Sequence, residues 1–233
     1  HVGYGGGDFR VGDGYVYFVE AGSGRIYRQS LSAGIAEPIT PGFGYAATPS
    51  LSPDGNWLLY VHSYEDKDCL AMVPASGEGW PQILVDGEDF YMQPVWSYDQ
   101  RYVAWVAWNH PNMPWDGTFL RMARLAWGTA TEKKEYPIVD KIETIAGDRD
   151  TSIFQPEFSP EGRYLAYVSD ESGWWQIYLY DLKSGERQQL THAAAEHGIP
   201  AWVQGLRTYQ FDGEGRRIFF LRNQNGDIRL IQI

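Results

Sequence analysis

The chain has 233 residues, of which 43% are hydrophobic and 15% aromatic, and its formal net charge at pH 7 is −11. The hydrophobic content excludes an intrinsically disordered chain, and the length fits one large all-β domain or two small ones. The acidity disfavours nucleic acid and anionic membrane surfaces as partners, and it suits a cationic ligand or a peptide amine better, although acidity that only aids solubility is the simpler explanation.

Two further features of the composition concern location and origin. Cys69 is the only cysteine, so an internal disulfide is impossible, which is compatible with a cytoplasmic protein. The sequence contains no run of about 18 apolar residues, so we expect no transmembrane helix. The sequence opens at His1 without a methionine, which indicates a piece of a longer chain.

The first unit follows a glycine-rich segment, residues 1–7. Strands are predicted at Tyr15–Glu20 and Arg25–Gln29, and the turn Gly22-Ser23-Gly24 between them indicates a hairpin. The segment Glu37–Gly42 closes this unit and leads to the next.

The second unit runs from Tyr45 to about Val85 and contains a hairpin whose second strand is Cys69–Pro74. The tip of this hairpin, Glu65–Asp68, is charged and suggests a cation site. Calcium loops place acidic oxygens at alternate positions and need a glycine turn, whereas here Lys67 interrupts and no glycine follows. We therefore expect a solvated tip and no metal.

The third unit, from Gln93 to about Glu143, carries an insertion at Asn109–Thr118, and the strand Phe119–Leu125 returns from it. Its prolines, glycine and polar residues predict an ordered loop. Loops on a rigid scaffold are where binding groups tend to lie.

The fourth unit, Thr151–Thr191, has turns after each of its predicted strands, which are Gln155–Phe158, Tyr164–Ser169, Trp175–Asp181 and Arg187–Leu190. The fifth unit begins near Pro200 and reaches Ile233. Helical periodicity is absent, and Ala193–His197 could form one short turn at most.

A short turn followed by an apolar strand recurs through all five units. Ser52-Pro53-Asp54-Gly55 is the clearest copy, and the acidic residue of the turn falls at Asp13, Asp54, Asp99, Glu161 and Glu214, with spacings of 41, 45, 62 and 53 residues. Periods of about 40 to 50 residues with several strands each are typical of propeller blades. The sequence thus predicts an all-β fold, a β-propeller of four-stranded antiparallel blades over residues 1–233, with about five blade units and an incomplete ring.

Two groups of residues are candidates for binding. In the insertion, His110, Asn112, Trp115 and Asp116 suit a peptide side chain or amino terminus, through an aromatic face and a carboxylate; the alternative is a packed loop with Trp115 at a blade interface.

The second group lies around the start of the fifth unit and consists of Glu196, His197 and Arg207. Arg207 could hold a carboxylate or a peptide carbonyl, and the alternative is a buried ion pair with a blade carboxylate. Trp174 and Trp175 are expected to pack between blades. The five histidines show no His-x-x-x-His pattern, so we expect no zinc site, and nothing indicates a cofactor.

Several segments resemble the propeller of the prolyl oligopeptidase family of serine peptidases, in particular its dipeptidyl aminopeptidase and acylaminoacyl peptidase branch. The more specific ones are Met113–Asp116 and Gly173–Trp175; the repeated Ser-Pro-Asp-Gly turns, Val2–Gly7 and Pro200–Tyr209 add to them. The resemblance covers essentially the whole chain.

This resemblance implies a seven- or eight-bladed propeller that precedes a C-terminal α/β-hydrolase domain, admits only short peptides and helps to hold them. The chain has no Gly-x-Ser-x-Gly nucleophile elbow and only about five units. By resemblance it is therefore a propeller fragment without the catalytic domain, with no catalytic residue of its own, whose partners are short peptides and the hydrolase domain.

Two other functions remain open at this point. A stand-alone propeller of the TolB type would serve as a binding or protein-interaction module. A propeller glycosidase or lyase would need converging carboxylates or histidines, and the sequence shows no such paired motif. Because an incomplete propeller exposes apolar blade faces, we also expect the isolated chain to dimerise or to close into a smaller ring.

Overall fold

The computed structural model describes residues 5–129 and 135–233, and these residues form strands, turns and loops without a helix. Within the described residues there is accordingly no helix long and apolar enough to cross a membrane. The strands form five separate antiparallel sheets, each with its strands in sequence order.

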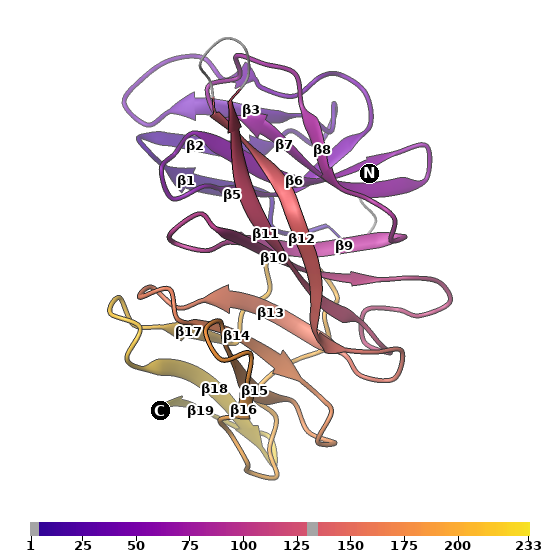
Figure 1. Ribbon diagram of the computed structural model, residues 1–233, viewed down its shortest axis with the longest axis vertical. Coiled ribbons are helices and arrows are strands. Elements are labelled where there is room, and N and C mark those ends of the chain that lie inside the picture. Colours follow the sequence, from indigo (N-terminus) through magenta and orange to yellow (C-terminus); the bar gives the residue numbers. More distant parts are fainter. Residues whose placement is uncertain (1–4, 130–134) are drawn as a thin grey trace.

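The sheets follow one another along the chain. The first contains β1 (Phe9–Gly12), β2 (Tyr15–Val19), β3 (Ile26–Ser30) and β4 (Glu37–Pro38); the second β5 (Tyr45–Leu51), β6 (Trp57–Tyr64), β7 (Lys67–Pro74) and β8 (Gln82–Val85); the third β9 (Phe90–Trp96), β10 (Tyr102–Trp108), β11 (Phe119–Thr129) and β12 (Glu135–Gly147); the fourth β13 (Ile153–Phe158), β14 (Tyr164–Ser169), β15 (Gln176–Asp181) and β16 (Arg187–Gln189); the fifth β17 (Tyr209–Phe211), β18 (Ile218–Gln224) and β19 (Asp227–Gln232). Figure 1 shows the succession, with the first sheets at one end of the long axis and the fifth at the other. The predicted all-β fold of five blade units is confirmed, with the predicted four strands in the first four sheets and three strands in the fifth.

The recurring turn owes its shape to one serine and one aspartate. In the second sheet, Asp54 accepts hydrogen bonds from Ser52 Oγ (2.6 Å) and from the amide of Asn56 (3.1 Å). Ser52 Oγ in turn accepts one from the amide of Trp57 (2.9 Å), the first residue of β6. The third sheet repeats the arrangement with Ser97 and Asp99. The buried serine thus fixes the turn and starts the next strand.

The hydrophobic core lies between the sheets. One cluster joins the first sheet to the second, a further one the second to the third, and the largest spans the third, fourth and fifth. Large aromatic side chains fill these spaces, among them the fully buried Trp105, Trp108, Tyr60, Tyr91 and Tyr167. Trp175 packs against the largest cluster, but Trp174 is 42% exposed at a hairpin turn, so the expectation that both tryptophans pack between blades is wrong for Trp174.

The innermost strands of three sheets share a kink. Thr48, Gln93 and Gln155 each have a φ of 50–52° and each precedes a proline. The strand register shifts at the same places in β5, β9 and β13. Such a bulge removes the local ladder bonds and turns the backbone amides toward the axis around which the sheets are arranged.

Glutamine side chains satisfy the groups that these kinks leave free. Gln93 Oε1 accepts from the amide of Gln155 at 2.7 Å, and Gln155 Nε2 donates to the carbonyl of Tyr209 at 2.6 Å. Gln155 Oε1 accepts from the amide of Thr208 at 2.6 Å. All of these hydrogen bonds are buried, so they bind the segment before β17 to the inner strands of the third and fourth sheets.

A third glutamine extends this network toward the start of the chain. Gln204 Oε1 accepts from the amide of Gln93 (2.9 Å), and Gln204 Nε2 donates to the carbonyl of Tyr91 (3.1 Å). The backbone of Gln204 also forms a parallel bridge with Gly6. The segment before the first sheet and the segment before the fifth therefore meet at the axis, although β1 and the fifth sheet pair no strands in the described part of the chain. The structure does not show the smaller closed ring.

The extra length of the third unit has two sources. The insertion between β10 and β11 accounts for one part, as predicted. The other part is the outer strand pair, since β11 has 11 residues and β12 has 13. The returning strand, expected at Phe119–Leu125, runs to Thr129 and pairs along its whole length with β12.

The two end sheets present apolar faces to solvent. On the fifth sheet, Leu221 and Leu230 pair across β18 and β19 on the side away from the core, and Leu230 is 70% exposed. Phe219 and Ile228 lie on the same side. On the first sheet, Phe9 and Val11 are similarly exposed. Both faces resemble the surfaces that neighbouring sheets bury inside the molecule.

We predict that Gln155→Ala destabilises the fold by about 2–4 kcal/mol, because the amide of Thr208 and the carbonyl of Tyr209 would lose their buried partner. Alanine and glutamine tolerate the left-handed φ of this position equally, so backbone strain does not change. Urea denaturation followed by circular dichroism measures the effect. Gln188→Ala, at an exposed strand position, is the control and should change stability by less than about 0.5 kcal/mol. Equal stability of both variants would contradict the role of the network.

Candidate functional site

One face of the molecule collects the connections that carry the candidate residues. In an antiparallel sheet with its strands in sequence order, the connection between the second and third strands lies at the same end as the link to the next sheet. We call this end of the molecule the crossover face. It contains the β6–β7 turn, the insertion Asn109–Thr118, the β14–β15 turn and the links between sheets.

The insertion is an ordered loop, as predicted, and neighbouring sheet links hold it at both ends. Asn109 Oδ1 accepts from the amide of Asp89 (2.7 Å), and Asn112 Nδ2 donates to the carbonyl of Arg149 (2.6 Å). Asp116 accepts from the amide of Met113 (2.9 Å) within the loop. At position 117 any side chain would collide with the carbonyl of Arg149, so this path of the loop requires glycine there.

His110 stands on the surface of this loop beside an acidic residue. Asp89 accepts from the backbone amide of His110 (2.9 Å) and lies 3.0 Å from its Nδ1. These hydrogen bonds lower the pKa of the Asp89 carboxyl. The imidazole remains mostly exposed and packs against the ring of Phe90 at 4.8 Å between centroids. The Asp89 carboxylate and an imidazole with one open edge are thus presented together on the crossover face.

Trp115 meets a residue that the sequence did not single out. Its ring lies 4.3 Å from that of Trp202, between centroids, at an interplanar angle of 36°. Trp202 comes from the segment between the fourth and fifth sheets and is 59% exposed, whereas Trp115 is half-buried. The two tryptophans therefore form an aromatic surface that joins both predicted segments. Only the long-range path of the chain brings them together.

Glu196 and His197 are used within the fold. Glu196 accepts from the amide of Trp175 at 2.9 Å, and its backbone bridges to Asn223. His197 is 1% exposed; its Nδ1 lies 3.1 Å from the carbonyl of Trp175, and its Nε2 lies 3.1 Å from Nε of Arg222. Since Arg222 can only donate, Nε2 is the acceptor and Nδ1 carries the proton. His197 is inaccessible to a ligand in this structure.

Arg207 lies apart from the other candidates. It donates to Glu157 at 2.6 Å, and both residues line a cavity of about 470 Å³ that also reaches Asp54 and Trp96, toward the face of the recurring turns. Burial raises the pKa of Glu157, and the charge of Arg207 opposes this shift. The pairing agrees with the alternative of an ion pair with a blade carboxylate, but Arg207 keeps half of its side chain exposed.

The described residues contain no group of three or more histidine, cysteine, aspartate or glutamate side chains that could hold a metal ion. The candidates that keep at least part of their surface open to solvent on the crossover face are thus His110, Asn112, Trp115 and Asp116, together with Trp202. What they offer is aromatic contact, hydrogen bonding and negative charge.

Comparisons with known proteins show which molecules share this architecture. No family model matches the sequence. Among solved structures, a Mycobacterium tuberculosis puromycin-hydrolyzing peptidase superposes with a TM-score of 0.80 at 29% identity, over 97% of this chain and 36% of that one. A puromycin hydrolase superposes with a TM-score of 0.81 at 25% identity, over 99% of this chain and 39% of that one.

Curated sequences give two kinds of relative. The peptidase YuxL of Bacillus subtilis is 24% identical over 182 residues, which are 76% of this chain and 23% of that protein. The Tol-Pal system protein TolB of Coxiella burnetii is 45% identical over 49 residues, or 21% of this chain and 11% of that protein. The chain therefore spans well under half the length of each of these proteins.

The burial of His197 predicts how the stability of the chain depends on pH. Burial, and the neighbouring Arg222 charge, lower its pKa from 6.5, so the unfolded state binds this proton more readily than the folded state. The stability that neutral His197 contributes is therefore complete above pH 6.5 and is lost as the pH falls through the lower pKa of the folded state. We predict that His197→Gln loses less stability than the unsubstituted chain between about pH 8 and pH 5. Urea denaturation at several pH values measures both curves, and parallel curves would contradict the prediction.

Proposed function

Since the chain is a β-propeller of the prolyl oligopeptidase family, we propose that it serves a serine peptidase as the part that limits access to the active site and positions short peptides. The observation that carries this proposal is the match of nearly the whole chain to the propeller of a puromycin-hydrolyzing peptidase. The dipeptidyl aminopeptidase and acylaminoacyl peptidase branch is our expectation for its subtype.

The topology supports a position for the hydrolase domain. A four-stranded sheet of this kind is entered at its first strand and left at its fourth strand on the same face. A domain joined ahead of a first strand, or after a fourth strand that completed the three-stranded fifth sheet, would thus lie over the crossover face. The insertion Asn109–Thr118 and Trp202 would then face the space between the two domains.

The exposed groups there suit a short peptide. The surface of Trp115 and Trp202 can pack against an apolar side chain, and the Asp116 carboxylate beside it can accept hydrogen bonds from a peptide amine. His110 and Asn112 add polar contacts at the edge of the loop. Arg207 is a second place of contact, in the cavity of about 470 Å³ that it lines with Glu157, where the exposed part of its side chain can hold a peptide carbonyl. Glu196 and His197 are left out of this set because the fold already uses them.

Hydrolysis itself needs groups that this sequence does not contain. An acyl-enzyme mechanism requires a serine on a strained strand-to-helix turn, with aspartate and histidine partners. The 233 residues include no Gly-x-Ser-x-Gly. We therefore expect the chain alone to bind peptides and to hydrolyse none.

A second candidate function rests on the short stretch that is 45% identical to TolB. In this alternative the propeller is a binding or protein-interaction module with no peptidase attached. The two functions are distinguished by the coding region that follows Ile233. A Gly-x-Ser-x-Gly motif within about 300 codons, followed by aspartate and histidine, is expected for the peptidase. A reading frame that stops soon after Ile233 would refute it in favour of the TolB-like module.

We predict that Trp115→Ala and Trp202→Ala each weaken the binding of a phenylalanine-containing tripeptide about tenfold, because the peptide loses aromatic contact area. Isothermal titration calorimetry with the 233-residue chain measures the affinity. Trp174→Ala, which removes an exposed tryptophan from another turn on the same face, is the matched control and should leave it unchanged. Unaltered binding in both test variants would refute this peptide site.

We also propose that the isolated chain forms a homodimer through the apolar face of the fifth sheet. Leu230→Glu should then shift the chain from dimer to monomer in light scattering after size-exclusion chromatography, because it places a charge at the centre of that face. Ile35→Glu removes an even more exposed apolar side chain from a loop and should leave the dimer intact. A monomeric unsubstituted chain would contradict the proposal.

A further inference from the structure

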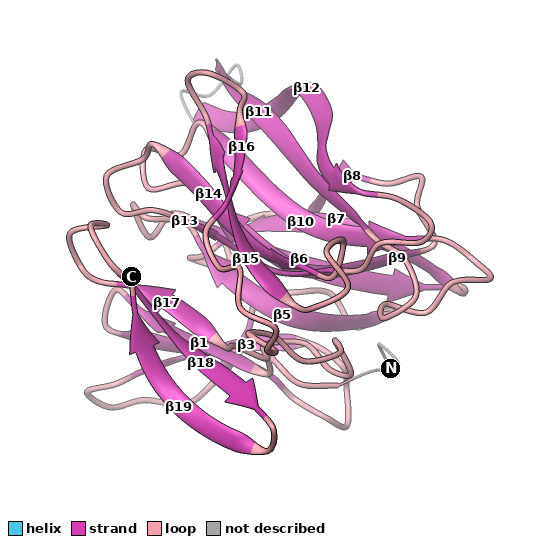
Figure 2. Ribbon diagram, turned by 90° about the horizontal axis from the view of Figure 1, so that it is seen from below, coloured by secondary structure: helices cyan, strands magenta, loops and turns pink. Residues whose placement is uncertain are grey.

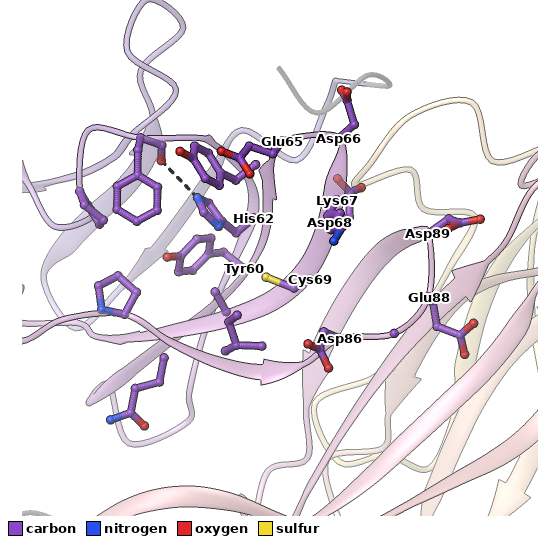
Figure 3. A pocket seen from close by; sticks show the side chains of 18 of the residues that line it. Tyr60, His62, Glu65, Asp66, Lys67, Asp68, Cys69, Asp86, Glu88 and Asp89 are labelled. Atoms are coloured by element: carbon purple, nitrogen blue, oxygen red, sulfur yellow. Dashed lines mark hydrogen bonds between the residues drawn. The ribbon is translucent and has the colours of Figure 1, made fainter.

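The second sheet carries a pocket of about 650 Å³ at its crossover-face end, and neither Trp115 nor Trp202 is among the residues that line it. Figure 3 shows Tyr60 and Cys69 at its base, His62 beside them, and Glu65 and Asp66 on the turn above. Phe43 and Trp80 contribute from the connections before β5 and before β8. The pocket thus draws on four segments of a single blade and on the link to the next.

Its wall is an aromatic cluster built around Phe43. The ring of Phe43 lies edge-on to Tyr64 at 5.3 Å and is stacked on Trp80 at 6.0 Å. His62 fixes the arrangement, because its Nε2 lies 3.2 Å from the carbonyl of Phe43. At Gly44, which has a φ of 65°, a Cβ atom would collide with His62 Nε2, so the wall requires glycine there.

These rings are held in place yet remain open to solvent. Trp80 is 70% exposed, and Tyr64 and Phe43 are both more than two-fifths exposed. Three aromatic residues that pack on each other around a concavity, and not into the core, expose apolar area that a soluble protein otherwise hides. Their faces carry the negative end of the ring quadrupole, which attracts a cation.

The lining is also strongly acidic. Six carboxylates, those of Glu65, Asp66, Asp68, Asp86, Glu88 and Asp89, stand against the single ammonium of Lys67. Glu88 is engaged by Arg121, and Asp89 by His110. Asp66 and Asp86 make no ion pair among the described residues. Burial, together with the charges of Asp68 and Asp86, raises the pKa of the Cys69 thiol at the base to about 11, so negative potential reaches the floor of the pocket.

We propose that this pocket binds a primary ammonium group carried on an apolar stem, as in a lysine side chain or a free alkylamine. The stem would lie against Phe43, Tyr64 and Trp80, and the ammonium would meet the carboxylates of Asp66 and Asp86. An aromatic wall beside unpaired carboxylates complements both halves of such a ligand. A metal ion suits the pocket less well, since it would leave the aromatic wall without a partner. The inference is independent of the proposed peptidase function.

The test compares ligands that differ only in charge. Ac-Ala-Lys-Ala-amide and its neutral counterpart Ac-Ala-norleucine-Ala-amide are titrated into the ¹⁵N-labelled 233-residue chain and followed by NMR. We expect the lysine peptide to bind with shifts at Tyr64, Asp86 and the Trp80 indole, and at least about tenfold more tightly than the norleucine peptide. Raising the salt from about 0.05 M to about 0.5 M should weaken its binding.

Variants assign the binding to this pocket. Trp80→Ala and Asp86→Asn should each weaken the lysine peptide about fivefold or more. Trp174→Ala and Glu186→Gln remove an exposed tryptophan and an exposed carboxylate elsewhere and should leave its affinity unchanged. Pentylamine distinguishes the two sources of the ammonium: binding comparable to that of the peptide indicates a free amine, and binding of the peptide alone indicates a lysine side chain.

Two outcomes would overturn the proposal. Equal affinity for the lysine and norleucine peptides would show a pocket that selects apolar stems and ignores charge. Lysine binding that Trp80→Ala and Asp86→Asn both leave intact would place the ammonium at another site. The NMR spectra of the variants also report whether each remains folded, so loss of binding through unfolding is recognised directly.

Discussion

The structure depends on the way in which its inner strands are joined at the axis. Each sheet buries apolar residues on its faces and therefore needs neighbours, but face packing alone does not fix where one sheet sits on the next. The buried hydrogen bonds of Gln93, Gln155 and Gln204 supply that position. They connect the kinked strands β9 and β13 to the segment before the fifth sheet, and a buried amide left without its partner makes any other placement costly.

The crossover face follows from this arrangement. Because Gln204 and Thr208 are tied to the axis, the residues just before them must pass over the ends of the third and fourth sheets. Trp202 is thereby carried to Trp115, whose loop is held independently by Asp89 and Arg149. The aromatic surface is thus positioned by two separate sets of backbone contacts, which is what a contact surface for a flexible peptide requires.

Local interactions explain what could be predicted from the sequence. The Ser-x-Asp turns bond within themselves, so their recurrence predicted five blade units and most of the strands. The insertion was recognised for the same reason, through its prolines and glycine. Trp202, the burial of His197 and the length of β11 and β12 were missed, because each depends on residues far away in the chain. The pocket of the second sheet draws on four segments, and the sequence shows only its charged tip, for which it predicts a solvated turn.

The energetics of that pocket argue that it is kept for binding. Like charges close together repel, and exposed aromatic rings forgo the stabilisation that burial would bring. Elsewhere in the chain carboxylates are commonly paired, as Glu157 is with Arg207 and Asp181 with Arg163. Around Phe43 the structure combines clustered carboxylates with exposed aromatic rings, and Gly44 and His62 hold the aromatic wall in place. Rigid elements that keep unfavourable groups together gain nothing in the free chain, and the cation that we propose for this pocket would supply the compensation.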